Sequence, residues 1–189
     1  MIQIRIHGRG GQGVVTAAEL IALAAFNDGL YAQAFPAFGV ERSGAPIQAF
    51  VRLDKRPIIT REQIYQPDIL IIQDESLLLD QSVLAGINAN TKLIVNSSQT
   101  PTEISRLLKK RLSANQIITN PATGIALELL GKNLVNTVIL GAFTQATAVI
   151  TIKSLQSAIT AKFKDKGQEI IHKNHAAVLA AYRYVRQPS

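Results

Sequence analysis

IRIHGRGGQGVVTAAELIALAAF, residues 4–26, places four glycines between a short apolar run and a long one. Residues 2–7 alternate between apolar and polar side chains, which predicts a β-strand that ends at the first glycine. Residues 12–27 are small or apolar almost all round, which predicts a helix that is buried on more than one side. Gly29 is the expected C-terminal cap of that helix. The stretch is therefore predicted to fold as a strand, a glycine turn and a buried helix.

The glycine turn has the composition of an anion-binding loop. Gly8, Gly10 and Gly13 fit the pattern G-x-G-x-x-G between a strand and a helix. A helix N-terminus carries unpaired N–H groups and about half a unit of positive charge, and glycines let the backbone approach a phosphate closely. The residues expected to bind the ligand are Gly8, Arg9, Gly10, Gly11, Gln12 and Gly13. A tight turn that binds nothing is the alternative.

The residues around this loop narrow the class of phosphate ligand. Val14 and Val15 stand where a P-loop would carry Lys followed by Ser or Thr, so that motif is excluded. A loop that binds NAD needs an acidic residue about 20 positions further on, at the end of the second strand. Gln33 occupies that region, and Asp28 comes too early. The sequence therefore favours a phosphate-bearing ligand other than NAD.

A second unusual segment links the expected strands at 30–35 and 47–54. Residues 36–46, PAFGVERSGAP, show no helical pattern, so the third strand need not be parallel to the second. Restricted, partly apolar loops of this length often serve binding or subunit contact. Its candidate residues are Phe38, Glu41 and Arg42. A structural ion pair within the loop is the alternative for the two charged residues.

The rest of the chain alternates strands with helices and then becomes helical. Strands are expected at 68–74, 92–96 and 116–120, and helices at 76–84, 101–112, 122–131, 133–149, 154–164 and 167–186. Such alternation predicts an α/β fold of Rossmann-like, three-layer type, with a mostly parallel sheet and helices on both faces. We expect one domain over 1–189, with an α/β core at 1–120 and a mainly helical part at 121–189.

The composition of the chain limits the functions that it can have. Charged residues make up 17% of the chain, below the roughly 25% of typical soluble domains, which indicates either cover by another chain or a large ordinary core. The net charge of +7 is scattered along expected helices without a nucleic-acid-binding module, so we expect no nucleic-acid partner. No run approaches the ~18 apolar residues of a membrane span. With a strand at the very start, we expect no signal peptide, no membrane partner and a cytoplasmic location.

The absence of cysteine excludes a disulfide, a thiolate nucleophile and a cysteine-ligated iron–sulfur cluster on this chain. His172 and His175 are spaced to share a helix face, but no third ligand lies nearby in the sequence, so we expect no metal site. His7, beside the glycine loop, is interpreted as a structural histidine or as a contact to the ligand.

Several stretches together resemble a known family. Residues 5–25, RIHGRGGQGVVTAAELIALAA, and 34–52, AFPAFGVERSGAPIQAFVR, are similar to the gamma subunit of 2-oxoacid:ferredoxin oxidoreductases, in particular the pyruvate enzyme. Residues 120–143 and 169–181 resemble the same subunit less specifically, so the similarity covers nearly the whole chain.

The resemblance implies a role in a larger enzyme. That enzyme decarboxylates a 2-oxoacid on thiamine diphosphate, passes electrons through iron–sulfur clusters to ferredoxin or flavodoxin, and transfers the acyl group to coenzyme A. Its gamma part is Rossmann-like and is associated with coenzyme A binding, which assigns that role to residues 8–13. Thiamine diphosphate, magnesium and the clusters are then expected on alpha, beta and delta-type partner subunits, since this chain lacks their motifs.

The chain is thus expected to be required but non-catalytic, with no catalytic residue of its own. The resemblance does not decide whether Phe38, Glu41 and Arg42 form subunit contacts or the entrance for the coenzyme. Two other functions stay open: a stand-alone regulatory module that binds a nucleotide or coenzyme A, and a purely structural assembly subunit.

Overall fold

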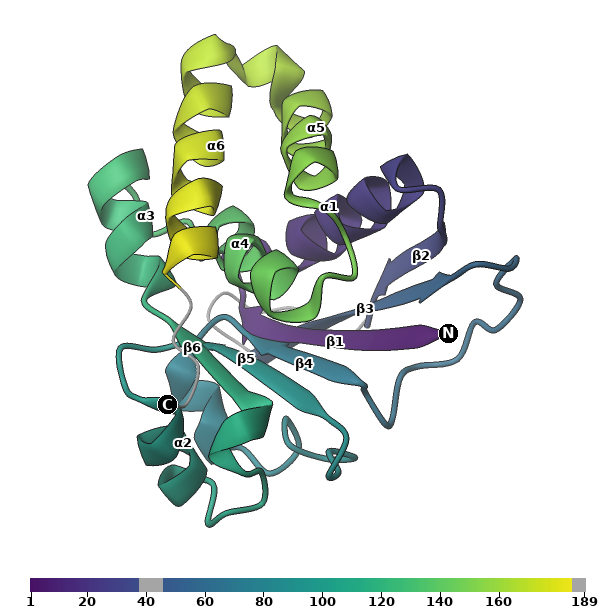
Figure 1. Ribbon diagram of the computed structural model, residues 1–189, viewed down its shortest axis with the longest axis vertical. Coiled ribbons are helices and arrows are strands. Elements are labelled where there is room, and N and C mark those ends of the chain that lie inside the picture. Colours follow the sequence, from purple (N-terminus) through teal and green to yellow (C-terminus); the bar gives the residue numbers. More distant parts are fainter. Residues whose placement is uncertain (38–45, 185–189) are drawn as a thin grey trace.

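The computed structural model describes residues 1–37 and 46–184 and is built around a six-stranded sheet of order β2-β3-β1-β4-β5-β6 (Figure 1). The strands are β1 (Ile2–Arg9), β2 (Tyr31–Pro36), β3 (Pro46–Asp54), β4 (Ile69–Ile72), β5 (Lys92–Asn96) and β6 (Ile117–Asn120). The α-helices are α1 (Val14–Asn27), α2 (Pro101–Leu107), α3 (Ala122–Leu130), α4 (Val135–Thr147), α5 (Ile152–Phe163) and α6 (Gln168–Arg183). Short 3₁₀ turns are η1 (Glu75–Leu79), η2 (Ala114–Gln116) and η3 (Lys164–Lys166).

The sheet is mostly parallel, as the sequence predicts. β1, β4, β5 and β6 pair in parallel, whereas β3 pairs antiparallel with both β1 and β2. Among the described strands, β3 alone therefore runs against the others. This direction agrees with the lack of helical pattern between β2 and β3, because a parallel pair would need a crossover.

Two apolar clusters lie on the two faces of the sheet because successive side chains of a strand point to opposite faces. In β4, Ile69 and Ile71 pack toward α1 and α4, while Leu70 and Ile72 pack on the opposite face with Ile104 of α2. All four residues of β4 are buried, which is typical of a central parallel strand.

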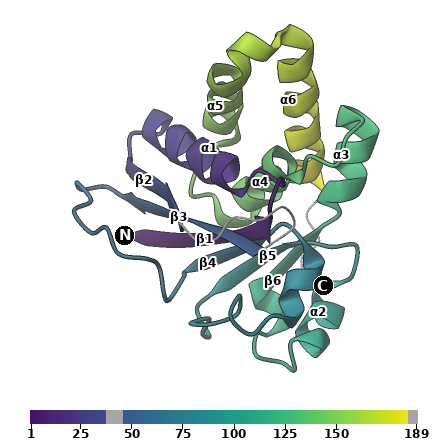
Figure 2. The same ribbon diagram turned by 180° about the vertical axis from the view of Figure 1, so that it is seen from behind.

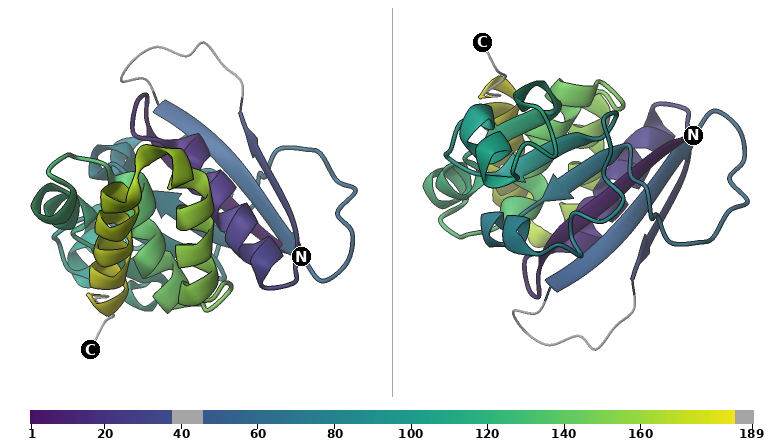
Figure 3. Two further views of the ribbon diagram at one scale, coloured as in Figure 1. Left: turned by 90° about the horizontal axis from the view of Figure 1, so that it is seen from above. Right: turned by 90° about the horizontal axis from the view of Figure 1, so that it is seen from below.

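Helices cover both faces, but unequally. The views from front, behind and above show α1, α3, α4, α5 and α6 on one face and α2 with η1 on the other (Figures 1, 2 and 3). α6 packs on α4, and α1 packs on α5. No helix in residues 1–37 and 46–184 combines the length and apolarity needed to cross a membrane.

Beneath β1 and β3, the second face is closed by irregular chain instead of a helix. Arg5 is 5% exposed and donates to the carbonyl oxygens of Val83 and Ala85 at 2.9 and 2.6 Å. Arg52 is 1% exposed and donates to the carbonyl of Glu62. Burial lowers the pKa of both guanidinium groups. The two arginines thus tie the segments around residues 62–65 and 83–85 to the sheet.

Two predicted helices are shorter in the structure. The helix expected at 76–84 is only the 3₁₀ turn η1, because the Asp80 carboxylate accepts from the backbone N–H and the hydroxyl of Ser82 and so favours a turn. The helix expected at 101–112 ends at Leu107, since Lys109 and Lys110 have φ of 51° and 59°. Its N-cap is Thr100, which forms a capping box with Glu103.

Candidate functional site

The glycine loop lies where the parallel strands end. It joins the end of β1 to the start of α1, beside the carboxyl ends of β4 and β5. Ligands of open α/β sheets bind outside the carboxyl ends of the strands, near a point where the strand order reverses. The loop predicted from the sequence is therefore at the edge of the sheet where a ligand site is expected.

The glycines of the loop differ in their surroundings. A Cβ atom on Gly8 would lie 2.6 Å from Cγ2 of Val14, and one on Gly13 would lie 2.5 Å from Nδ2 of Asn136 in α4. Gly11 has φ of +91° and nothing within 4 Å of a Cβ. Gly8 and Gly13 thus allow close packing of the loop, and the backbone at Gly11 faces open space.

The polar side chains of the loop converge on Asp74, at the end of β4. Nε of Arg9 lies 3.2 Å from Oδ2 of Asp74, and Nε2 of Gln12 donates to the same oxygen at 3.1 Å. Oε1 of Gln12 also accepts from the backbone N–H of Arg9 at 2.7 Å. Nη2 of Arg9 donates to Oγ of Ser76 at 2.7 Å. Arg9, which the sequence assigns to the ligand, is therefore already paired within the chain.

The carboxyl group of Asp74 is ionised and accepts several hydrogen bonds. Partial burial acts to raise the pKa of this carboxyl group, but hydrogen bonds from Ser76 and Gln12 and the charge of Arg9 outweigh burial, so the pKa lies below its usual value. No motif in the sequence predicts a role for Asp74. Its position two residues after the apolar run of β4 is the signal that could have identified it, because that run and β1 end at the same edge of the sheet.

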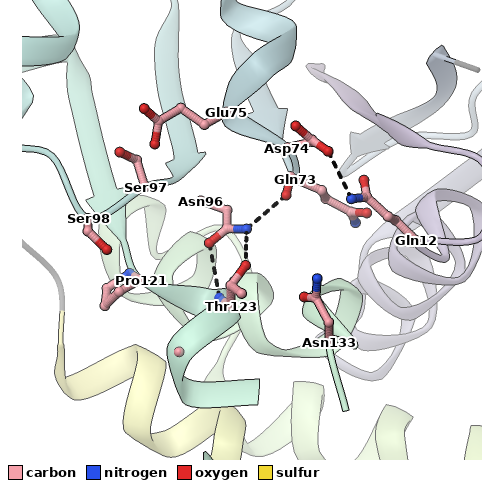
Figure 4. Close-up of a pocket in the computed structure, with 11 residues that line it drawn as sticks. Gln12, Gln73, Asp74, Glu75, Asn96, Ser97, Ser98, Pro121, Thr123 and Asn133 are labelled. Carbon is pink, nitrogen blue, oxygen red and sulfur yellow. Dashed lines mark hydrogen bonds between the residues drawn. The ribbon is translucent and has the colours of Figure 1, made fainter. Parts of the chain in front are cut away.

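A polar cavity of about 270 Å³ opens beside the loop, between the ends of β4, β5 and β6 and the first turn of α3 (Figure 4). Its lining residues are Gln12, Gln73, Asp74, Glu75, Asn96, Ser97, Ser98, Pro121, Thr123, Gly124 and Asn133. Nδ2 of Asn96 donates to the Gln73 carbonyl and to Oγ1 of Thr123, at 2.9 and 2.8 Å. Of the predicted site residues that the structure describes, only Gln12 lines this cavity.

A larger cavity of about 640 Å³ lies at the other end of β1. It is lined by Met1, Ile2, Leu30, Leu53, Asp54, Lys55, Arg56 and Val149. Because β1 runs away from this cavity toward the glycine loop, the two lie at opposite edges of the sheet, and the apolar cavity is not part of the candidate site.

The three histidines lie in different surroundings. His7 is 5% exposed, and burial together with the charge of Arg5 lowers its pKa to about 3, so the ring is neutral at physiological pH. Nε2 of His175 lies 2.9 Å from the carbonyl oxygen of Gln156 and thus joins α6 to α5. His172 is exposed. Within the described ranges, no cluster of three His, Cys, Asp or Glu residues is arranged to hold a metal ion.

Phe38, Glu41 and Arg42 lie outside the described residues, so their assignment to the coenzyme entrance or to subunit contacts stays a prediction.

The family model described as "Pyruvate ferredoxin/flavodoxin oxidoreductase" matches residues 3–184. The chain belongs to this family. The PorC subunit of pyruvate synthase from Methanosarcina barkeri is 49% identical over 161 residues, which cover 85% of this chain and 86% of that one. The common gamma subunit of the pyruvate/ketoisovalerate oxidoreductases from Thermococcus litoralis is 47% identical over 182 residues, 96% of each chain.

Two solved structures have the same fold. The PORC subunit of pyruvate oxidoreductase from Thermotoga maritima has 31% identity and a TM-score of 0.83, over 100% of this chain and 98% of that chain. The 2-oxoglutarate:ferredoxin oxidoreductase of Magnetococcus marinus, 21% identical with a TM-score of 0.76, contains the same fold within 32% of its chain. The gamma-subunit resemblance is thus confirmed, and the chain is a subunit of an oxidoreductase complex.

Proposed function

We propose that this chain binds coenzyme A for a pyruvate-type 2-oxoacid:ferredoxin oxidoreductase and is itself non-catalytic. The observation that carries the proposal is the loop between β1 and α1, whose backbone at Gly11 faces open space with φ of +91°. Among the described residues, the N–H groups of Gly11 and Gly13 have no hydrogen-bond acceptor. Together with the positive end of the α1 dipole, they fit the phosphates of coenzyme A.

The chain's contribution is binding and orientation. Coenzyme A, when bound, supplies the thiol that accepts the acyl group. Backbone amides of the loop would fix its acidic portion, so that the thiol is delivered repeatedly to the same place on a partner subunit. Orientation of this kind lowers the barrier to a reaction between two molecules by as much as ~7–11 kcal/mol in well-aligned systems.

The redox chemistry is assigned to other chains. This chain has no cysteine and so cannot supply the thiolates that hold an iron–sulfur cluster. We assign thiamine diphosphate, magnesium and the clusters to alpha, beta and delta-type partners. These partners would also deliver electrons to ferredoxin or flavodoxin. In this assignment pyruvate is the substrate, in keeping with the names of the relatives.

One observation favours a purely structural subunit as the second candidate. Arg9 and Gln12 are already engaged by Asp74, as they would be in a loop that only joins a strand to a helix. The test must therefore act on the open backbone at Gly11 and leave these contacts in place.

The experiment compares Gly11→Asp with Gly29→Asp in the assembled oxidoreductase. Both glycines have positive φ, +91° and +82°, and neither has an atom within 4 Å of a Cβ, but they stand at opposite ends of α1. A carboxylate at Gly11 would repel phosphate, so the KM for coenzyme A should rise roughly tenfold or more. Gly29→Asp should leave this KM unchanged.

Both variants should assemble normally, which gel filtration of the complex would show. Equal KM values for coenzyme A in the two variants would support the structural candidate. Isolation of the chain from its own cells without any partner subunit would contradict both candidates.

A further inference from the structure

Gln73, at the end of β4, has a side-chain amide that the fold leaves unsatisfied. The residue is 0% exposed, and neither Nε2 nor Oε1 has a hydrogen-bond partner among the described residues. Its backbone is well held, because its N–H donates to the His7 carbonyl at 2.8 Å and its own carbonyl accepts from Asn96 at 2.9 Å. Buried polar groups without partners destabilise a fold, and those that remain need an explanation.

Gln73 is one of the residues that line the polar cavity beside the glycine loop, and its side chain points toward Gln12 (Figure 4). Of the described residues that line this cavity, two are acidic, Asp74 and Glu75, and none is Lys, Arg or His. The remaining polar lining consists of amides and hydroxyl groups. A phosphate would be repelled here, whereas an uncharged group with its own hydrogen-bond donor and acceptor suits the lining.

Gln12 connects the cavity to the glycine loop. A Cβ on Gly8 would lie 3.0 Å from Oε1 of Gln12 and 3.0 Å from Oε1 of Gln73, so both side-chain oxygens lie close to Gly8. Gln73 has no exposed surface, and a ligand can reach its amide only if a neighbouring side chain moves. The Gln12 side chain is held by hydrogen bonds to Arg9 and Asp74 and can exchange them for a ligand.

We propose that this cavity is the subsite for an uncharged part of the acidic ligand, one that presents a hydrogen-bond donor beside an acceptor, and that Gln73 recognises it. This inference rests on the proposed binding of phosphates at the loop. Coenzyme A carries such a group in two places: the edge of its adenine, which a glutamine amide can bind with two hydrogen bonds, and the amides of its pantetheine arm. In either case the ligand spans the loop and the cavity.

The experiment replaces Gln73 by Met in the assembled oxidoreductase, because Met is similar in size and unbranched. We expect the KM for coenzyme A to rise about tenfold through loss of the amide contacts. Inhibition by pyrophosphate, which has no such group, should be unchanged. Inhibition by ADP or by pantetheine, but not both, should weaken, and this identifies the part of the ligand that occupies the cavity.

Thr144→Val is the matched control. Oγ1 of Thr144 is also buried without a partner, but it lies in α4 and does not line the cavity. Both Gln73→Met and Thr144→Val should keep or raise the melting temperature of the chain. Only Gln73→Met should raise the KM for coenzyme A.

The inference is overturned if Gln73→Met leaves the KM for coenzyme A unchanged. It is also overturned if the variant weakens inhibition by pyrophosphate as much as it weakens inhibition by ADP or by pantetheine. A failure of the proposed function gives a different result. In that case Gly11→Asp leaves the KM for coenzyme A unchanged, whatever Gln73→Met does.

Discussion

Replacement of Gly13 by Ala tests how the glycine loop is fixed between α1 and α4. Gly13 is the N-cap of α1 with φ of 71°, a conformation that costs a residue with a Cβ about 1–2 kcal/mol. The added Cβ would also lie 2.5 Å from Nδ2 and 3.2 Å from Cβ of Asn136. The amide end can rotate away at a cost of roughly 0.5–1.5 kcal/mol, whereas the Cβ cannot. We therefore expect Gly13→Ala to lower the free energy of unfolding by about 2–3 kcal/mol.

The steric cost that comes from the amide end should disappear when Asn136 is also replaced by Ala, whereas the contact with Cβ remains. A double-mutant cycle, measured by urea unfolding of the purified chain, should give a coupling of about 1 kcal/mol between the two positions. Gly29→Ala is the control for the backbone alone, because its φ is +82° and no atom lies within 4 Å of a Cβ. The reasoning fails if Gly13→Ala costs no more than Gly29→Ala, or if the cycle shows no coupling.

Three further predictions concern the charged groups. Asp28, Asp74 and Asp80 have pKa values lowered in the folded chain, so they stabilise it above the pKa of an unfolded aspartate, about 4. Urea unfolding at a series of pH values should show stability falling as the pH drops below about 4, and a flat profile down to pH 2 would be inconsistent with these shifts. Asp28 accepts hydrogen bonds from Thr151 at 2.7 and 2.9 Å and so joins the end of α1 to the start of α5. Asp28→Ala should lower the unfolding free energy by about 1–2 kcal/mol and flatten part of that pH profile; an unchanged midpoint in urea would contradict this. Asp74→Asn removes a negative charge beside the loop while keeping a good cap for η1, so the KM for coenzyme A should fall about threefold. A rise in KM would instead show that Asp74 is needed to position Arg9 for the ligand.

The local order of elements could be predicted from the sequence because it depends on neighbouring residues. The alternation of residues 2–7, the glycines that follow and the Thr100 cap each carry their own signal, and the structure contains the corresponding elements. The length of the helix expected at 76–84 could not be predicted, since Asp80 and Ser82 form a turn by side-chain hydrogen bonds within an otherwise helical pattern.

The buried polar groups could not be predicted because their partners are distant in the sequence. Nη2 of Arg5 donates to the carbonyl groups of residues 83 and 85, which periodicity does not reveal. In the same way, the loop was identified from its glycines, but its pairing with Asp74 depends on β1 and β4 lying side by side. Gln73 would have been assigned to an ordinary strand end, and only the structure shows its amide buried without a partner.

A structure of the assembled oxidoreductase with coenzyme A bound, determined by electron cryo-microscopy, is the most direct measurement. Phosphate oxygens of the coenzyme should lie within hydrogen-bonding distance, about 2.7–3.2 Å, of the backbone nitrogens of Gly11 or Gly13. Coenzyme A phosphates bound elsewhere in the complex, with residues 8–13 touching no ligand, would show that the glycine loop serves only to join β1 to α1.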